Sequence, residues 1–228
     1  MNRRNILIGL GVVAAGTAAG GAWWLTRGQQ APATAAGEAP SGMVLATAAG
    51  DMPIYDDDHI LGDASAPVTF IEYASLTCGH CGAFHRETLP QVKENWIDAG
   101  RARLVYRHYP LDQLALRAAA VTECMQGDAF FGFLDVLFNN QEKWAGSADP
   151  LQLIGQYAAL AGLGREAYEA CLSDNAAIDR ILKRQTDGRD RYNIASTPSF
   201  VVNGTPVIGN QSYEEFNRVL EAAASKAS

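Results

Sequence analysis

The segment "APVTFIEYASLTCGHCGAFH", residues 66–85, gives the strongest indication of the fold. It opens with a β-branched and aromatic run after Pro67, and because this run is apolar on both faces it predicts a central strand. The run leads into Cys78 and Cys81, two thiols three positions apart, and apolar residues at helical spacing follow over 83–100. The stretch therefore predicts a strand that ends at a CxxC pair, with the pair at the start of a helix.

The pattern on either side of this stretch sets the fold class. A second strand is predicted over 101–110, and only helices are predicted over 111–192. Asn203-Gly204 lies between two apolar runs, which predicts a hairpin, and an amphipathic helix follows over 212–224. The order strand, helix, strand, helical block, hairpin and helix predicts an α/β, thioredoxin-like fold interrupted by an all-helical insertion domain.

We divide the chain into four parts on this pattern. They are an export signal or N-terminal membrane anchor over 1–27, a flexible linker over 28–55, a thioredoxin-like domain over 56–110 and 193–228, and a helical insertion domain over 111–192. The linker assignment rests on small, almost uncharged residues such as those of "GQQAPATAAGEAPSG".

The N-terminus predicts the compartment. Arg3 and Arg4 precede a long uncharged run, which is typical of an export signal. The run is close to the ~20 residues that span a bilayer, so both a cleaved signal and an uncleaved anchor with Trp23 and Trp24 at the interface remain open. Either way, we expect the rest of the chain in the periplasm or on the extracytoplasmic side of the membrane, where disulfides form.

Composition excludes other classes of protein. With 228 residues and 48% apolar residues, the chain is long enough to bury its own core, so it needs no staple to fold. Eighteen basic residues against 25 acidic ones leave a net charge of −7. A nucleic-acid partner is therefore not expected, since binding to a phosphate backbone needs a basic surface.

The CxxC pair allows four interpretations. A zinc site with Cys78, Cys81 and His85 lacks a second ligand pair at metal-binding spacing, and covalent haem needs histidine where Gly82 stands. A structural disulfide across such a short loop removes little chain entropy. A redox-active pair fits best, because a Cys78 thiolate at the helix N-terminus would face unpaired amides, with His80 as a further stabilising group. No metal or other cofactor is expected.

These motifs, together with "STPSFVVNG" over 196–204, resemble the DsbA-like thiol-disulfide oxidoreductases. The resemblance implies that Cys78 is the attacking thiol and Cys81 the resolving thiol. It also implies that Pro198 is a cis-proline that faces the pair, with Thr197 before it as part of the substrate-binding segment. Glu72 would be the buried acid that assists proton transfer, against the alternative of a solvated strand residue.

The same resemblance implies an exported oxidase that donates its disulfide to reduced or unfolded exported proteins. A membrane reoxidase of the DsbB type would recharge it. Gly79-His80 and Thr197 depart from the best-known oxidase and resemble the isomerases, so the direction of the reaction stays open. A reductase or isomerase, and a non-catalytic chaperone or metal-binding module, are the alternatives. His85 and His108 are interpreted as ordinary histidines of the surface or the core.

Two further cysteines lie in the predicted insertion domain. Cys124 and Cys171 both occupy amphipathic helices, and an exported chain with a dithiol oxidant is not expected to leave two spare thiols free. We therefore predict a structural disulfide between them, with two buried free thiols as the alternative.

Overall fold

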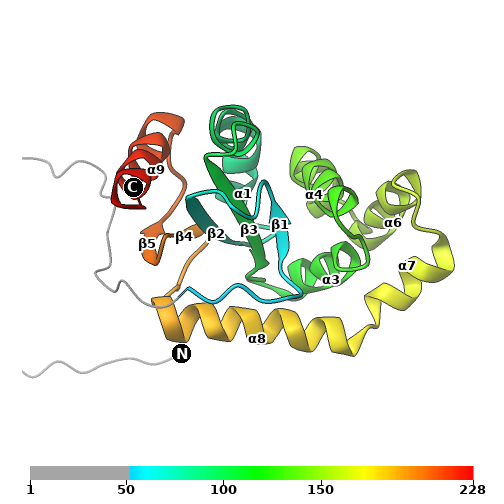
Figure 1. Cartoon of the computed structure of the whole chain (residues 1–228). Helices are drawn as coiled ribbons and strands as arrows, with labels where there is room; N and C mark the ends of the chain where they lie inside the picture. The colour runs from blue at the N-terminus through cyan, green and yellow to red at the C-terminus, as the bar shows by residue number, and fades with distance from the viewer. Residues whose placement is uncertain (1–51, 228) are drawn as a thin grey trace, which may run out of the picture. The chain divides into compact units, whose positions relative to one another are not determined.

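The computed structural model describes residues 52–227, and Figure 1 shows them as a mixed sheet flanked by helices, with further helices beyond one edge. The predicted export signal or anchor over 1–27, and the linker as far as residue 51, lie outside the described residues. Within residues 52–227, no helix is long and apolar enough to cross a membrane.

The sheet has five strands in the order β1-β3-β2-β4-β5. The strands are β1 (His59–Leu61), β2 (Val68–Ala74), β3 (Ala102–His108), β4 (Ser199–Val202) and β5 (Thr205–Ile208). β2 and β3 are parallel, whereas the other neighbouring strands are antiparallel. All seven residues of β2 are buried, as expected for the central strand that the sequence predicts. The predicted hairpin at Asn203-Gly204 joins β4 to β5, and both turn residues have positive φ.

The helices form three groups. The first follows β2 and comprises α1 (Gly79–Ala83), η1 (Phe84–Thr88), α2 (Leu89–Val92) and η2 (Lys93–Ile97). The second forms the helical block and comprises α3 (Gln113–Thr122), α4 (Asp128–Asn139), α5 (Gln141–Ala145), α6 (Pro150–Leu160), α7 (Arg165–Leu172) and α8 (Asn175–Tyr192). The last helix is α9 (Tyr213–Ala227). Within residues 111–192 the structure contains no strand, in agreement with the predicted insertion.

The helix after the CxxC pair widens twice into π-helical turns, at η1 and η2. Pro90 lies in the first turn of α2, directly after η1. Proline has no amide hydrogen, and its ring clashes with the carbonyl four residues earlier, so the backbone must open at this point. The widened turn lets one nearly continuous helix run from the cysteines to the end of η2.

The alternating side chains of β2 divide the core between the two faces of the sheet. Phe70 packs with Phe84 and Trp96 of the first helical group and with α9, on one face. Ile71 and Tyr73 pack on the opposite face with residues at the end of α8. Figure 1 shows α8 along one face of the sheet and α1 and α9 on the other.

Helix α8 contributes to two cores, whereas the sequence places all of it in the insertion domain. Its first half packs in the helical core, where Ile181 is buried, whereas Tyr192 joins the core beneath the sheet. Gly188 is required at the contact, because a Cβ there would lie 2.5 Å from the ring of Tyr73. The two halves of α8 thus pack in different surroundings.

The N-terminal boundary also differs from the prediction. Residues 52–55, which the sequence assigns to the linker, pack against the sheet. The buried Arg107 of β3 donates 2.7 Å to the carbonyl of Pro53 and forms an ion pair with Asp58 at 2.6 Å. β1 is not predicted from the sequence, because it spans three residues at the sheet edge and has no clear strand pattern. The folded part thus begins no later than Met52.

Cys124 and Cys171 form a disulfide, with their Cα atoms 6.2 Å apart. The bond connects the end of α3 to α7 across a sequence separation of 47 residues. In the chain-entropy model, closing a loop of this length stabilises the folded state by about 4 kcal/mol. The disulfide is therefore expected to stabilise the folded helical block over residues 111–192.

Candidate active site

The CxxC pair lies at the junction of β2 and α1. The chain turns after β2, and the amide of Cys78 donates 3.1 Å to the carbonyl of Ser75. Cys78 is the N-cap residue of α1, with an extended backbone, so its sulfur lies beside amides that have no partner within the helix. Cys81 lies one turn further along and is fully buried, whereas Cys78 is half-buried. Both cysteines are free thiols in this structure.

The two thiols have opposite electrostatic environments. A hydrogen bond from the Cys81 thiol is the largest contribution that lowers the pKa of Cys78, to about 5, against an opposing effect of burial. The backbone amides of Cys81 and His80 lower it further. The side chain of His80 is exposed, so this residue contributes through its backbone rather than through the imidazole that the sequence suggests.

Cys81 is shifted in the other direction. Burial, then the hydrogen bond to Cys78 and the charge of Glu72, raise the pKa of Cys81 far above the ordinary thiol value. At neutral pH the pair therefore holds one thiolate, on Cys78, and one thiol, on Cys81. The half-exposed sulfur with a lowered pKa and the buried sulfur with a raised pKa thus belong to different residues.

Thr197 approaches Cys78 from the other side. The Thr197-Pro198 peptide bond is cis, as the resemblance implies, and the segment leads directly into β4. The Cys78 thiol donates 3.3 Å to the Thr197 carbonyl. The Thr197 hydroxyl is buried and has no hydrogen-bond partner among residues 52–227, yet it lowers the pKa of Cys78 because it can donate to the thiolate. It is therefore a donor held ready for the ionised sulfur.

Glu72 lies below the pair, on β2, and its side chain is fully buried. This position rules out the solvated strand residue that the sequence left as an alternative. Because side chains alternate along a strand, Glu72 points to the same face as Phe70, which is the face that the cysteine-bearing helix covers. Its charge is close enough to raise the pKa of Cys81.

His85 is a site residue that the sequence interpretation missed. Its Nε2 lies 3.1 Å and 3.2 Å from the two carboxylate oxygens of Glu72, and its ring stacks on Phe138 with the centroids 4.0 Å apart. The signal was in the spacing, because His85 follows Cys81 by four residues and so shares its helix face. His108 is a core residue that bonds Thr122, as interpreted from the sequence.

Gln141 is the second missed residue, and it comes from α5 of the helical domain. Its side-chain nitrogen donates 2.7 Å to the carbonyl of Leu76 and 2.9 Å to that of Cys78. Gly82 makes this approach possible, since a Cβ there would lie 2.5 Å from the Gln141 amide oxygen. Helix α5 thus contacts the turn between β2 and α1, which carries Cys78, and no sequence pattern indicates this contact.

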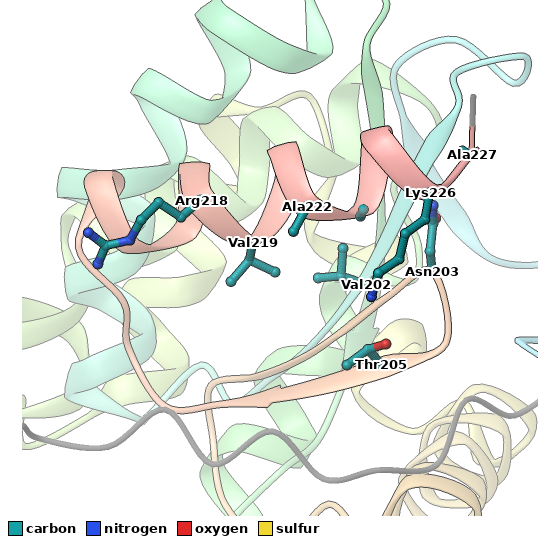
Figure 2. A pocket seen from close by; sticks show the side chains of 9 residues that line it. Val202, Asn203, Thr205, Arg218, Val219, Ala222, Lys226 and Ala227 are labelled. Atoms are coloured by element: carbon teal, nitrogen blue, oxygen red, sulfur yellow. The ribbon is translucent and has the colours of Figure 1, made fainter. Parts of the chain in front are cut away.

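A separate cavity of about 500 Å³ lies between α9 and the β4–β5 hairpin, as Figure 2 shows. Val202, Val219 and Ala222 line it, with Arg218 and Lys226 at its ends, and neither cysteine of the CxxC pair contributes to its wall. Across residues 52–227, no group of three or more potential ligands is placed to hold a metal ion.

Comparisons with known proteins agree with this geometry. The sequence model of a family described as thioredoxin matches residues 55–222. A protein of Rickettsia felis named as a protein-disulfide oxidoreductase is 29% identical over 74% of this chain, and the match spans 60% of that protein's length. The chain thus covers less than two thirds of this relative.

Two solved structures extend the comparison. The crystal structure of Wolbachia pipientis alpha-DsbA1 is 32% identical, with a TM-score of 0.71, over 77% of this chain and 94% of that one. BdbD from Bacillus subtilis, 22% identical with a TM-score of 0.66 over 76% of this chain and 96% of that one, shares the fold. Together with the match over residues 55–222, these likenesses show that the chain belongs to the DsbA-like branch of the thioredoxin family.

Proposed function

We propose that the chain is an exported thiol-disulfide oxidase that transfers the Cys78–Cys81 disulfide to reduced proteins. One observation carries the proposal: the pKa of Cys78 is lowered to about 5 while that of Cys81 is raised by burial. A stabilised thiolate stabilises the dithiol state of the enzyme relative to its disulfide state. Such a pair accepts electrons from substrate thiols.

The reaction proceeds in two exchanges. A substrate thiolate attacks the Cys78 sulfur of the enzyme disulfide, a mixed disulfide forms, and Cys81 leaves as a thiolate that takes up a proton. The second substrate thiolate then attacks the substrate sulfur of the mixed disulfide, and Cys78 leaves as a thiolate. The substrate loses two electrons and forms its disulfide, while the enzyme gains those electrons.

The geometry supports Cys78 as the sulfur that substrates reach. It is half-buried beside the Thr197-Pro198 segment, whereas Cys81 has no exposed surface. The backbone carbonyl of Thr197 lies 3.3 Å from the Cys78 sulfur. An extended substrate chain can add to this backbone in the manner of a short β-bridge, which would hold its cysteine against Cys78.

Partners and compartment follow from the same proposal. The substrates would be reduced or unfolded exported proteins, and a membrane reoxidase of the DsbB type would restore the disulfide. The work would take place in the periplasm or on the extracytoplasmic side of the membrane, with the N-terminal segment either cleaved or kept as an anchor. The charged run of Arg3 and Arg4 before an uncharged segment supports export.

The redox potential tests the direction. Equilibration of the full chain with glutathione buffers should give a potential near that of known oxidases, about −120 mV, rather than that of thioredoxin, about −270 mV. The oxidised chain should also form a disulfide in a reduced two-cysteine peptide. A thioredoxin-like potential would overturn the oxidase assignment.

The isomerase is the second candidate, because Gly79-His80 and Thr197 resemble the isomerases. Refolding of scrambled ribonuclease separates the two: an isomerase restores activity without added oxidant, whereas an oxidase acts only on the reduced substrate. A non-catalytic binding module would oxidise no peptide and would not catalyse insulin reduction.

A further inference from the structure

His85 lies between the buried acid of the site and a second cavity. On one side its Nε2 contacts both carboxylate oxygens of Glu72, at 3.1 Å and 3.2 Å. On the other side the residue lines a cavity of about 590 Å³ between η1, α2 and η2 and helix α4. Its second ring nitrogen, Nδ1, is buried and has no hydrogen-bond partner within residues 52–227. The imidazole therefore has one occupied and one unoccupied nitrogen.

The chemistry of the pair requires a proton to cross this region. Cys81 has no solvent-exposed surface, yet it gains a proton when the disulfide is reduced and loses it when the disulfide reforms. Cys78, with a pKa of about 5, needs no such exchange at neutral pH. Buried groups next to Cys81 that connect it with the solution would serve this proton exchange.

Polar groups surround the route from several elements. Glu72 on β2 and Tyr106 on β3 face His85 from the sheet, the Tyr106 ring centroid at 6.0 Å. Asp135 on α4 lines the same cavity, near Lys93, and its pKa is raised overall, mainly by partial burial. Arg86, next to His85, also lines the cavity, and it donates to the Phe138 carbonyl at 2.9 Å. The mouth of the cavity is thus polar, whereas Phe138 covers the flat face of the ring.

We propose that His85 relays the proton of Cys81 between Glu72 and the cavity at Asp135, a role that rests on the proposed function. When Cys81 leaves as a thiolate, the Glu72 carboxylate takes the Nε2 hydrogen of His85 and passes it to Cys81, while Nδ1 takes a proton from the cavity. When the disulfide reforms, each transfer reverses. The histidine tautomer is thus restored in every full cycle, and the ring does not need to turn.

His85 acts on Cys81 only through Glu72, so it is a positioning and relay residue rather than a catalytic one. A proton relay and a structural support can be told apart by the reaction step that each affects. It should affect the step in which Cys81 loses its proton and attacks, but not the reaction of Cys78 with its first partner. The two steps can be separated in time.

The experiment follows oxidation of the reduced full chain by oxidised glutathione in a stopped-flow fluorimeter. At low glutathione the rate reports attack by Cys78, and at high glutathione it reaches a plateau set by the attack of Cys81 on the mixed disulfide. In His85→Gln the side-chain amide can still donate to Glu72 but cannot pass a proton on. We expect the plateau to fall about 10-fold or more, as for loss of a general acid–base group.

The pH profile and a matched variant complete the test. The low-glutathione rate should stay within about twofold of wild type, whereas the His85→Gln plateau should rise steeply with pH because hydroxide must replace the relay. His108→Gln, the same change at the other buried histidine, should leave both steps unchanged. A His85→Gln plateau equal to that of wild type would overturn the relay.

Two further outcomes keep the proposals distinct. If His85→Gln does not fold, Asp135→Asn decides, because that residue is exposed on the cavity wall; a lowered plateau supports the relay and an unchanged one overturns it. If the wild-type chain oxidises no reduced peptide, the proposed function fails. The relay is judged on the glutathione plateau alone.

Discussion

The chain carries two pairs of cysteines whose surroundings differ in every physical respect. Cys78 and Cys81 are three positions apart at a helix N-terminus, above a buried carboxylate, and one sulfur is held as a stabilised anion. Cys124 and Cys171 connect two helices across 47 positions. In the proposed function the first pair exchanges electrons with substrates, whereas the second closes a long loop. We infer from this comparison that the environment of a sulfur, rather than its pairing, decides whether a disulfide is redox-active or structural.

The comparison predicts its largest effect at Cys78. Cys78→Ser should reduce peptide oxidation to the uncatalysed background, because Cys81 has no exposed surface and cannot replace it. Cys81→Ser should instead accumulate mixed disulfides through Cys78, visible on non-reducing gels.

Iodoacetamide at pH 6 should label Cys78 of the reduced chain almost alone, since only this thiol is ionised there. Equal labelling of Cys81 would contradict the assignment.

Loss of the Cys124–Cys171 disulfide should change the stability of the chain and not its redox activity. Replacing both Cys124 and Cys171 by alanine should remove about 4 kcal/mol of stability, which lowers the melting temperature by roughly 10 °C for a domain of this size. The redox potential of the CxxC pair should not change. Thermal unfolding and glutathione equilibration on the same variant measure the two quantities. A shifted redox potential with an unchanged melting temperature would contradict the structural role of the Cys124–Cys171 disulfide.

The pH dependence of stability should distinguish the pairs as well. The folded pKa of Cys78, about 5, lies below the ordinary thiol value of 9.0, so its contribution is fully present above pH 9 and is lost as pH falls toward 5. The melting temperature of the reduced chain should therefore gain on that of reduced Cys78→Ser between pH 5 and pH 9. A constant difference across this range would mean that the Cys78 thiolate is not stabilised by folding.

The smallest effect is expected at Thr197. Thr197→Val removes a donor that faces the Cys78 thiolate but keeps the shape of the side chain. A single neutral hydrogen bond contributes about 1 kcal/mol, so the pKa of Cys78 should rise by roughly one unit or less. The redox potential should fall by about 20 mV. Thiolate absorbance against pH measures the first change, and a pKa that stays at about 5 would assign the hydroxyl no part in it.

Much of the fold could be predicted from local sequence patterns. The strand at residues 68–74, the hairpin at Asn203-Gly204 and the helices of the insertion follow from runs, spacings and turn residues close together in the sequence. The three-residue strand β1 could not be predicted, because pairing with β3 rather than its own composition makes it a strand. The packing of residues 52–55 likewise depends on Arg107, about 50 positions away along the chain.

The candidate site likewise contains residues that the sequence identifies and residues that only the folded structure reveals. Cys78, Cys81 and Pro198 stand in recognisable motifs, so the sequence identifies them. The partnership of His85 with Glu72 arises when a helix covers a strand, and only the four-residue spacing from Cys81 hinted at it. The contact of Gln141 with the redox turn joins residues more than 60 positions apart. Such contacts depend on tertiary packing, which a single sequence does not display.

The contact of Gln141 has a mechanical consequence. One amide group of the helical domain holds two carbonyls of the turn that presents Cys78. The helical domain therefore cannot tilt away from the sheet unless these two hydrogen bonds break and the turn is released. In the proposed function, a substrate that displaced Gln141 would therefore also release the turn that presents Cys78.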